Sequence, residues 1–289
     1  MTENRILILG SSGLIGHQVY NYLADDKKYT LYNLACKNKF RNDTILLDAR
    51  DEKNLIETIN RIQPQFIINC IGILISESNK NPDNAIFLNS YMPHMLSRLA
   101  DKIDAKLIHI STDCVFSGYK KVPYIENDFK DGNDIYAKSK GLGEVINNRH
   151  LTLRTSVVGP ELKSNGEELF HWFMTQQEDI YGYTKAIWSG VSSLELAKAV
   201  KWAIENEITG LYHVTNNSSI TKFDLLRLFQ KYTKKNININ QVDGSDVDKS
   251  FTDTRLLINY KIPSYDEMIF DMVKSMANNP SLYAQYKKA

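Results

Sequence analysis

The sequence predicts an α/β protein, a doubly wound parallel sheet covered by helices, with a smaller lobe in the C-terminal part of the chain. Two observations carry this prediction. Short, continuously apolar runs alternate with amphipathic stretches of helical period over about the first 160 residues, which is typical of parallel strands buried on both faces. The first apolar run also leads directly into closely spaced glycines and then into a helical pattern. This order of strand, tight turn and helix opens many sheets of this class.

The composition of the 289 residues is that of an ordinary globular protein. Hydrophobic residues make up 43% and charged residues 24%, and the net charge of +1 gives no field for binding polyanions, so we expect no nucleic-acid partner. The three cysteines, Cys36, Cys70 and Cys114, lack the close pairing of a zinc site or redox disulfide. We therefore predict no metal site and a reducing, cytoplasmic location. We expect no membrane span or signal peptide, because no apolar run has the required length.

The first unit of the predicted sheet contains the glycine turn. Residues 5–9 form an apolar strand, and residues 17–23 follow the turn with a helical pattern. Gly10 permits the tight turn, Gly13 lets the backbone approach a pyrophosphate at the helix N-terminus, and Gly16 lets helix and strand pack closely. A purely structural turn is the alternative, but the flanking strand and helix favour a dinucleotide site. Its predicted contacts in the turn are Gly10, Ser12, Gly13, Leu14, Ile15 and Gly16.

The second predicted strand, residues 30–35, favours NADP over NAD. In NAD-binding proteins an acidic residue near the end of this strand holds the adenosine ribose hydroxyls, and none is present here. Lys37, Lys39 and Arg41 follow instead, where the 2′-phosphate of NADP would lie. A solvated basic loop is the alternative, so NAD stays open as the cofactor. Lys37 is the predicted contact.

The third predicted strand, residues 45–48, ends at Asp48. With Ala49, this carboxylate is placed to contact the adenine amino group of a bound dinucleotide. A helix over residues 52–62 follows and is closed by Pro64, whose ring cannot continue a helix.

The fourth predicted strand, residues 66–70, is again continuously apolar and leads into a glycine. Ligands of such sheets bind at the carboxyl ends of the strands. An amphipathic helix is predicted next, over residues 84–103, with Asn89 near its middle as a further cofactor contact. The residues that we expect beside the nucleotide at the strand end are Cys70, Ile71 and Gly72.

A polar cluster follows the fifth predicted strand, residues 106–110. Ser111, Thr112 and Asp113 emerge at its carboxyl end, where a hydroxyl could share a substrate oxygen with a second proton donor. A turn or cap of polar residues is the alternative. Residues 117–135 are rich in Gly, Asp, Asn and Lys, which predicts a long loop before the next helix.

That next helix carries Tyr136 and Lys140. Residues four apart share one face of a helix, so the ammonium of Lys140 can favour the phenolate and lower the pKa of Tyr136 from its usual value of ~10. A tyrosine tuned in this way can exchange a proton with a substrate oxygen. The spacing also arises by chance in a chain with 16 tyrosines, and a solvated helix face is the alternative.

The regular alternation loosens after this helix. The remaining predicted elements are a strand at 151–155, a helix at 191–206, a strand at 211–214, a helix at 221–232 capped by Thr221, and a last helix at 265–276. We predict a cofactor-binding domain over residues 1–160, to which residues 190–215 return, and a substrate-binding lobe formed mainly by residues 161–289.

Together these motifs resemble the extended short-chain dehydrogenase/reductase family, whose fold is Rossmann-like. The resemblance runs through nearly the whole chain and rests on the GxxGxxG turn at 10–16, on Ser-Thr-Asp at 111–113, and on YxxxK at 136–140 with Gly143-Glu144 behind it. Within the family, the stretches 111–118, 123–126 and 154–156 are most similar to the dTDP-4-dehydrorhamnose reductases.

The resemblance implies a function and a role for each catalytic residue. Such enzymes use NADPH to reduce the 4-keto group of a nucleoside-diphosphate 4-keto-6-deoxyhexose, for the sugars of surface polysaccharides. By motif, Thr112 would hydrogen-bond the keto oxygen and Tyr136 would donate its proton. Lys140 would lower the pKa of the tyrosine and hold the nicotinamide ribose.

The resemblance also implies substrate contacts. Asp113 and Cys114 would border the sugar, and a C-terminal segment similar to one in related reductases would hold the diphosphate through Lys249 and Arg255. The guanidinium of Arg255 has paired N–H donors that suit bidentate contacts with a phosphate. Surface charges beside a strand are the alternative. The base, the sugar and the oligomeric state stay open, with a homodimer as one option.

Cys114 suggests an alternative function. Dehydratases of the superfamily carry an acid at this position, so the cysteine argues against elimination chemistry. In epimerase-reductases that make GDP-fucose, a cysteine two residues beyond the catalytic hydroxyl works with a histidine, and His171 is the candidate partner here. A buried, inert cysteine is the other interpretation. A second alternative is a non-catalytic NADP-binding subunit, because one relative in the family regulates methionine adenosyltransferase.

Overall fold

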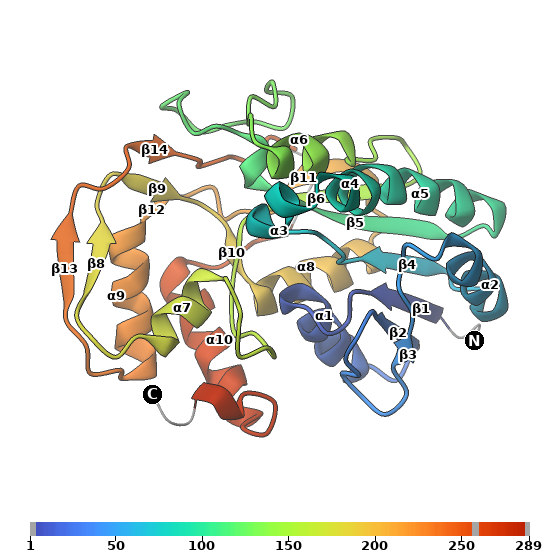
Figure 1. The fold of residues 1–289 in the computed structure, drawn as a ribbon, viewed down its shortest axis with the longest axis horizontal. Coiled ribbons are helices and arrows are strands. Elements are labelled where there is room, and N and C mark those ends of the chain that lie inside the picture. Colours follow the sequence, from blue (N-terminus) through green and yellow to red (C-terminus); the bar gives the residue numbers. More distant parts are fainter. Residues whose placement is uncertain (1–3, 256–259, 287–289) are drawn as a thin grey trace.

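A seven-stranded parallel sheet forms the centre of the computed structural model, which describes residues 4–255 and 260–286 (Figure 1). The strand order is β11-β6-β5-β4-β1-β2-β3, and every neighbouring pair runs parallel. The strands are β1 (Asn4–Leu9), β2 (Tyr29–Ala35), β3 (Ile45–Leu46), β4 (Phe66–Asn69), β5 (Lys106–Thr112), β6 (Leu151–Thr155) and β11 (Gly210–His213). The predicted fold class is thereby confirmed.

The apolar runs that predicted the strands are buried on both faces of the sheet. In β1, Ile6 and Ile8 face one core and Leu7 and Leu9 the other, because successive side chains of a strand point to opposite faces. All four are fully buried. Burial on both faces explains why these strands are continuously apolar in sequence.

Helices cover both faces of the sheet. Side chains of α1 (Leu14–Ala24), α8 (Ser193–Glu205) and α10 (Tyr265–Asn278) share the core on one face, and those of α2 (Glu52–Ile62) and α5 (Met92–Lys102) share the core on the other. Two short helices, α3 (Ile75–Lys80) and α4 (Pro82–Ala85), follow β4. None of the helices in the described ranges is both long and apolar enough to cross a membrane.

The predicted single helix over residues 84–103 is interrupted in the structure. A π-helical segment, η1 (Ile86–Tyr91), separates α4 from α5 and contains Asn89. Pro93 has no N–H to donate to the carbonyl of Asn89, four residues earlier, so the α-helical ladder cannot be continuous here. The wider turn leaves the Asn89 side chain free for contacts with other parts of the chain.

The second lobe lies beside one end of the sheet, at the left of Figure 1. Its elements are α7 (Leu169–Thr175), β8 (Ile180–Tyr183), β9 (Ala186–Trp188), β12 (Ile220–Thr221), α9 (Lys222–Thr233), β13 (Ile239–Val242) and β14 (Val247–Asp248). Strand β13 pairs with β8, and β9 pairs with β12 and β14. Thr221 caps α9 by accepting from the N–H of Asp224 at 3.0 Å, as predicted.

The chain returns from this lobe to the main sheet. The predicted helix at 191–206 begins only at Ser193, because β10 (Val191–Ser192) pairs with β7 (Val157–Val158) and the Ser192 hydroxyl caps the helix. Strand β11 then joins the sheet next to β6. This return supports our proposal that residues 190–215 belong to the cofactor-binding domain.

Candidate active site

The carboxyl end of β5 carries the predicted catalytic hydroxyl. The strand runs two residues further than the sequence indicated and ends at Thr112, followed by a 3₁₀ turn, η2 (Asp113–Val115). The hydroxyl of Thr112 accepts from the N–H of Cys114 (3.1 Å) and donates to a carboxylate oxygen of Asp113 (3.2 Å). Thr112 is therefore fixed by the turn that follows it.

Helix α6 (Ile135–Leu142) brings Tyr136 and Lys140 to this strand end. The Asp134 side chain begins the helix by accepting from the N–H of Ala137 at 2.7 Å. Tyr136 and Lys140 are both buried, one helical turn apart. The ammonium of Lys140 donates to the carbonyl oxygen of Ile110 in β5 at 2.7 Å. The solvated helix face, the alternative for this spacing, is excluded by their burial.

The electrostatics of the pair differ from the sequence-based expectation. The pKa of Tyr136 is raised from 10, chiefly because burial disfavours the phenolate; Cys114 adds to the rise and a hydrogen bond with Thr112 opposes it. Burial lowers the pKa of Lys140 to about 8, against the opposing charges of Glu144 and Cys70. The expected lowering of the tyrosine pKa by Lys140 is therefore not found. The phenol of Tyr136 keeps its proton at neutral pH.

Two pockets meet at this place. One, of about 400 Å³, is lined by Thr112, Tyr136 and Lys140 and extends to residues 161–168. The other, of about 590 Å³, runs from the glycine turn across the ends of β2 and β3. The described residues that line both pockets are Gly13, Cys70, Ile71, Gly72 and Lys163. The two pockets together offer an elongated groove at the carboxyl ends of the strands, as expected for a dinucleotide and a second ligand.

The glycine turn fits the diphosphate of a dinucleotide. Gly10 has φ +79°, and a Cβ on Gly16 would lie 2.3 Å from the carbonyl oxygen of Gly10, so neither position tolerates a side chain without strain. Helix α1 begins after Gly13 with no side-chain cap and no acidic residue in its first turn. Its free N–H groups and positive end can therefore hold an anion.

Most of the predicted cofactor contacts line one of the two pockets. These are Gly10, Ser12, Gly13, Leu14, Ile15, Lys37, Asp48, Ala49, Cys70, Ile71 and Gly72. Gly16 and Asn89 do not. Asn89 is buried, accepts from the N–H of Ile73 (2.8 Å) and donates to the hydroxyl of Ser139 (3.1 Å). It therefore ties the loop after β4 to helix α6 instead of lining the groove.

Of the three cations predicted after the second strand, only Lys37 lines the groove. Lys39 donates to the carbonyl of Asn42, and Arg41 stacks on the ring of Tyr20 at 5.3 Å. A 2′-phosphate at this end of the groove would meet Lys37.

Arg50 is a groove residue that the sequence did not reveal. It lies next to Asp48 and holds that carboxylate at 2.5 Å, which lowers the pKa of Asp48 to about 2. Arg50 also donates to the side chain of Asn84 at 3.0 Å. Asp48 therefore lines the groove as part of an ion pair, and its contact with the adenine stays a prediction.

Comparison with known proteins assigns the chain to a family. Residues 4–251 match the family model described as RmlD substrate binding domain. The chain belongs to this family. The dTDP-4-dehydrorhamnose reductase of Shigella flexneri is 25% identical over 245 residues, 81% of this chain and 80% of that protein. Methionine adenosyltransferase 2 subunit beta of Mus musculus is 26% identical over 77% of this chain and 70% of its own length. The expected resemblance to the reductases is confirmed.

Solved structures of two sugar-nucleotide enzymes share the fold. The dTDP-4-dehydrorhamnose reductase of Bacillus anthracis, in complex with NADP, has a TM-score of 0.81 at 23% identity and covers 95% of this chain and 99% of its own. The dTDP-glucose 4,6-dehydratase of the same organism, in complex with NAD, has a TM-score of 0.79 at 15% identity and covers 98% of this chain and 100% of its own.

In this RmlD-family chain neither of the two cations predicted for the substrate diphosphate lines one of the two pockets. Lys249 lies close enough to Asp113 and Cys114 for their charges to raise its pKa, against the effect of its burial. Arg255 instead stacks over the ring of Tyr212 at 5.0 Å and lines neither pocket. Arg255 thus lies at the sheet edge formed by β11, and its assignment to the diphosphate stays a prediction.

Cys114 and His171 are not partners in the structure. The His171 ring is hydrogen-bonded to the hydroxyl of Tyr286 (2.7 Å) and to the carbonyl of Ser164 (3.2 Å). Cys114 lines the pocket, but burial raises the pKa of its thiol to about 12. A protonated thiol without a neighbouring base is a poor acid–base catalyst, so the geometry favours the inert-cysteine interpretation.

Two further titratable residues, Glu168 and Lys222, escaped the sequence analysis. Burial raises the pKa of Glu168, which lines the pocket, to about 8, and Lys222 is among the opposing charges. Lys222 stands in the first turn of α9, where the helix dipole disfavours a cation. A lysine at this position is therefore a signal in the sequence that other charges stabilise it. Asp113 is one of these charges.

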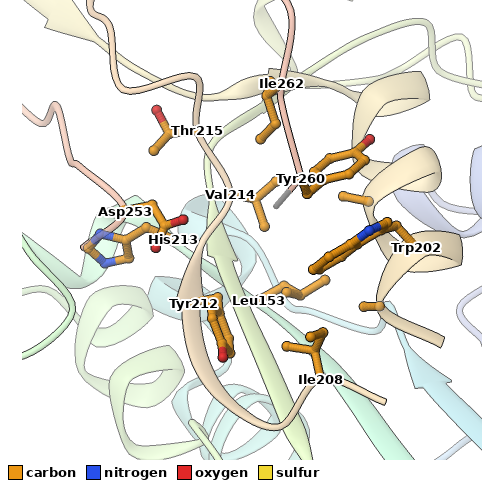
Figure 2. Close-up of a pocket in the computed structure, with 12 residues that line it drawn as sticks. Leu153, Trp202, Ile208, Tyr212, His213, Val214, Thr215, Asp253, Tyr260 and Ile262 are labelled. Atoms are coloured by element: carbon orange, nitrogen blue, oxygen red, sulfur yellow. The ribbon is translucent and has the colours of Figure 1, made fainter. Parts of the chain in front are cut away.

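A third pocket, shown in Figure 2, lies between α8 and β11 and shares no lining residue with the groove. Trp202, Tyr212 and Tyr260 are the large aromatic residues among those that line it (Figure 2). Its volume is about 40 Å³, room for a water molecule or so. It is too small for a nucleotide sugar.

Proposed function

We propose that this protein is an NADPH-dependent oxidoreductase that reduces the 4-keto group of a nucleoside-diphosphate 4-keto-6-deoxyhexose, as a dTDP-4-dehydrorhamnose reductase does. One observation carries the proposal. Thr112, Tyr136 and Lys140 line a pocket that is continuous, through Gly13, with a groove that fits a dinucleotide. Curated relatives named dTDP-4-dehydrorhamnose reductase support this choice of reaction. A role in making sugars for surface polysaccharides belongs to the same proposal.

The chain's own residues orient the ketone and supply the proton. When bound, the reduced nicotinamide supplies the hydride. The hydroxyl of Thr112 hydrogen-bonds the keto oxygen, and Tyr136, protonated because burial raises its pKa, gives its proton to that oxygen. The charge of Lys140 then favours the phenolate that remains. If the ammonium of Lys140 turns toward the phenolate or a ribose hydroxyl, its hydrogen bond to the carbonyl of Ile110 breaks.

The substrate would lie on the side of the pocket that faces the second lobe. Asp113 and Cys114 line that side, and Lys249 lies close to both. We therefore assign Lys249 to the substrate diphosphate. Arg255 stacks on Tyr212, whereas Lys249 interacts with Asp113 and Cys114 of the pocket wall, so Lys249 is the stronger candidate.

The two alternatives are less well supported. An epimerase-reductase would need a base beside Cys114, and His171 is hydrogen-bonded to Tyr286 and Ser164 instead. A purely regulatory subunit, the second alternative, would not need a buried Tyr136 and Lys140 at one strand end.

The proposal is tested by following NADPH absorbance with a panel of dTDP-, UDP- and GDP-linked 4-keto-6-deoxyhexoses. We expect oxidation with at least one of them, and a product that carries one deuterium at C4 when the NADPH is deuterated at the position that transfers its hydride. Oxidation with none would refute the proposal and favour the regulatory alternative. Exchange of hydrogen at C3 or C5 with solvent would favour the epimerase-reductase.

A further inference from the structure

Lys163 lies where the two pockets of the groove meet. It belongs to the loop of residues 159–168, between β7 and α7, and its side chain is exposed. The other described residues that line both pockets are glycines or uncharged side chains, and Lys163 is the charged member of the set. Any anion that spans the junction therefore passes this ammonium.

The ammonium of Lys163 has no protein partner within the described ranges: it forms neither a hydrogen bond nor an ion pair. Three carboxyl groups, those of Glu161, Glu167 and Glu168, stand in the same loop and line one of the same pockets without pairing with Lys163. Glu161 accepts from the N–H of Glu168 at 3.1 Å, and Glu167 is exposed to solvent. Lys163 thus keeps its donors available to a ligand.

Hydrogen bonds hold the ends of this loop in place. The Glu168 carboxylate accepts from the N–H groups of Gly159 (3.1 Å) and Phe170 (2.8 Å). The carbonyl of Ser164, next to Lys163, is hydrogen-bonded to the ring of His171 at 3.2 Å. The backbone that carries Lys163 is therefore positioned before a ligand arrives, which reduces the entropy lost on binding. These contacts also give His171 a structural role.

The N-terminus of α1 forms the other side of the junction. Gly13 precedes the helix and lines both pockets. The first-turn N–H groups have no side-chain cap, so they can donate hydrogen bonds to a phosphate. A diphosphate at the junction would meet backbone donors on one side and a lysine on the other.

We propose that Lys163 is a diphosphate-binding residue that holds its ligand against the N-terminus of α1. The inference rests on the proposed function, because the dinucleotide cofactor and the nucleotide sugar each carry a diphosphate. The two sources share the chemistry that Lys163 recognises, and separate binding measurements distinguish them.

The test compares Lys163→Ala and Lys163→Arg with the wild-type protein and with Lys102→Ala. Lys102 is an exposed lysine at the end of α5 and serves as a matched control. NADPH binding is measured by fluorescence titration. The binding of dTDP, UDP and GDP to protein saturated with NADP⁺ is measured by calorimetry. The probe 2′-AMP, which has a phosphate but no diphosphate, is measured by competition with NADPH.

We expect Lys163→Ala to lower the affinity for either NADPH or the nucleoside diphosphate by about tenfold, which is the effect of losing one charge-assisted contact. The ligand whose affinity falls is the one whose diphosphate Lys163 binds. Lys163→Arg should retain most of the affinity, and 2′-AMP should bind Lys163→Ala as it binds the wild type. The difference in affinity between the wild type and Lys163→Ala should become smaller at high salt, since the contact is electrostatic.

Wild-type affinity of Lys163→Ala for all these ligands, within the range of Lys102→Ala, overturns the inference and leaves the proposed function standing. An equal loss of 2′-AMP affinity also overturns it, because the effect would then not depend on a diphosphate. If the wild-type protein binds neither NADPH nor any of the nucleoside diphosphates, the proposed function fails first and the inference fails with it.

Discussion

Replacing Lys140 by methionine should stabilise the fold while removing the proposed activity. Lys140 is buried, and this burial lowers the pKa of its ammonium from 10.5 to about 8. Since each pKa unit corresponds to about 1.4 kcal/mol, holding the charged ammonium inside the protein costs about 3 kcal/mol of folding free energy at pH 7. Methionine has a similar length and carries no charge.

The lost hydrogen bond reduces this gain. The ammonium of Lys140 donates to the carbonyl of Ile110 at 2.7 Å, and such a bond contributes about 1 kcal/mol. We therefore expect Lys140→Met to be more stable than the wild type by about 2 kcal/mol at pH 7. A change of that size is large for one substitution.

The pH dependence gives the sign of the effect. Below about pH 8 Lys140 is protonated in both the folded and the unfolded protein, so the cost is fully present. Between pH 8 and 10.5 the folded protein releases its proton while the unfolded chain still holds it, so wild-type stability rises with pH relative to the variant. The advantage of Lys140→Met should be lost by about pH 10.5.

The measurement is urea unfolding of the wild type, Lys140→Met and Lys138→Met at pH 7 and pH 10, with NADPH oxidation followed in parallel. Lys138 is exposed on the same helix and controls for the loss of a lysine from α6. If Lys140→Met is less stable than the wild type by the same amount at both pH values, burial of the ammonium does not lower the free energy of unfolding. That result would refute the reasoning.

Four further outcomes are expected. Tyr136→Phe should lower the rate of NADPH oxidation by about 10²–10⁴-fold, the usual worth of a positioned acid, with an unchanged urea midpoint; near-normal turnover would remove Tyr136 from its role. The wild-type rate should fall above about pH 8, where Lys140 loses its charge, and a rate that climbs through pH 9 would contradict this. Arg154→Met should destabilise the fold by about 3–5 kcal/mol in urea, because it leaves the buried Glu144, now held at 2.7 Å, without its main partner. Gly16→Ala should abolish NADPH binding in fluorescence titration, since its Cβ would lie 2.3 Å from the carbonyl of Gly10; tight binding by this variant would show that the turn does not form the site.

The fold was predictable where local pattern and burial agree. The run Ile6–Leu9 is apolar because both faces of β1 are buried, and that pattern is visible without the structure. The π-helical turn at Asn89 was not, because it depends on contacts with Ile73 and Ser139 that come from other parts of the chain. The absence of an N–H at Pro93 is a local signal, but it does not by itself say where a helix will widen.

Only those features of the site that follow from motif spacing were predictable from the sequence. Tyr136 and Lys140 share a helix, so their proximity follows from spacing, whereas the pKa of Tyr136 follows from burial that spacing does not report. Lys249 and Arg255 are six residues apart in sequence, yet one approaches Asp113 and the other stacks on Tyr212. The bridge between Tyr124 and Phe251 fixes the path of that segment, and such a pairing across the chain carries no signal in the sequence.

The protonation states of Tyr136 and Lys140 favour one direction of reaction. Reduction of a ketone begins with a proton on the donor, whereas oxidation of an alcohol begins with a base. Burial raises the pKa of Tyr136 and so keeps the phenol protonated, and Thr112 lines the same pocket, where its hydroxyl can bind the same substrate oxygen. Lys140 has a pKa of about 8, so near neutral pH it remains charged when that proton leaves. The motif alone fits either direction; the burial of both residues supports use as a reductase.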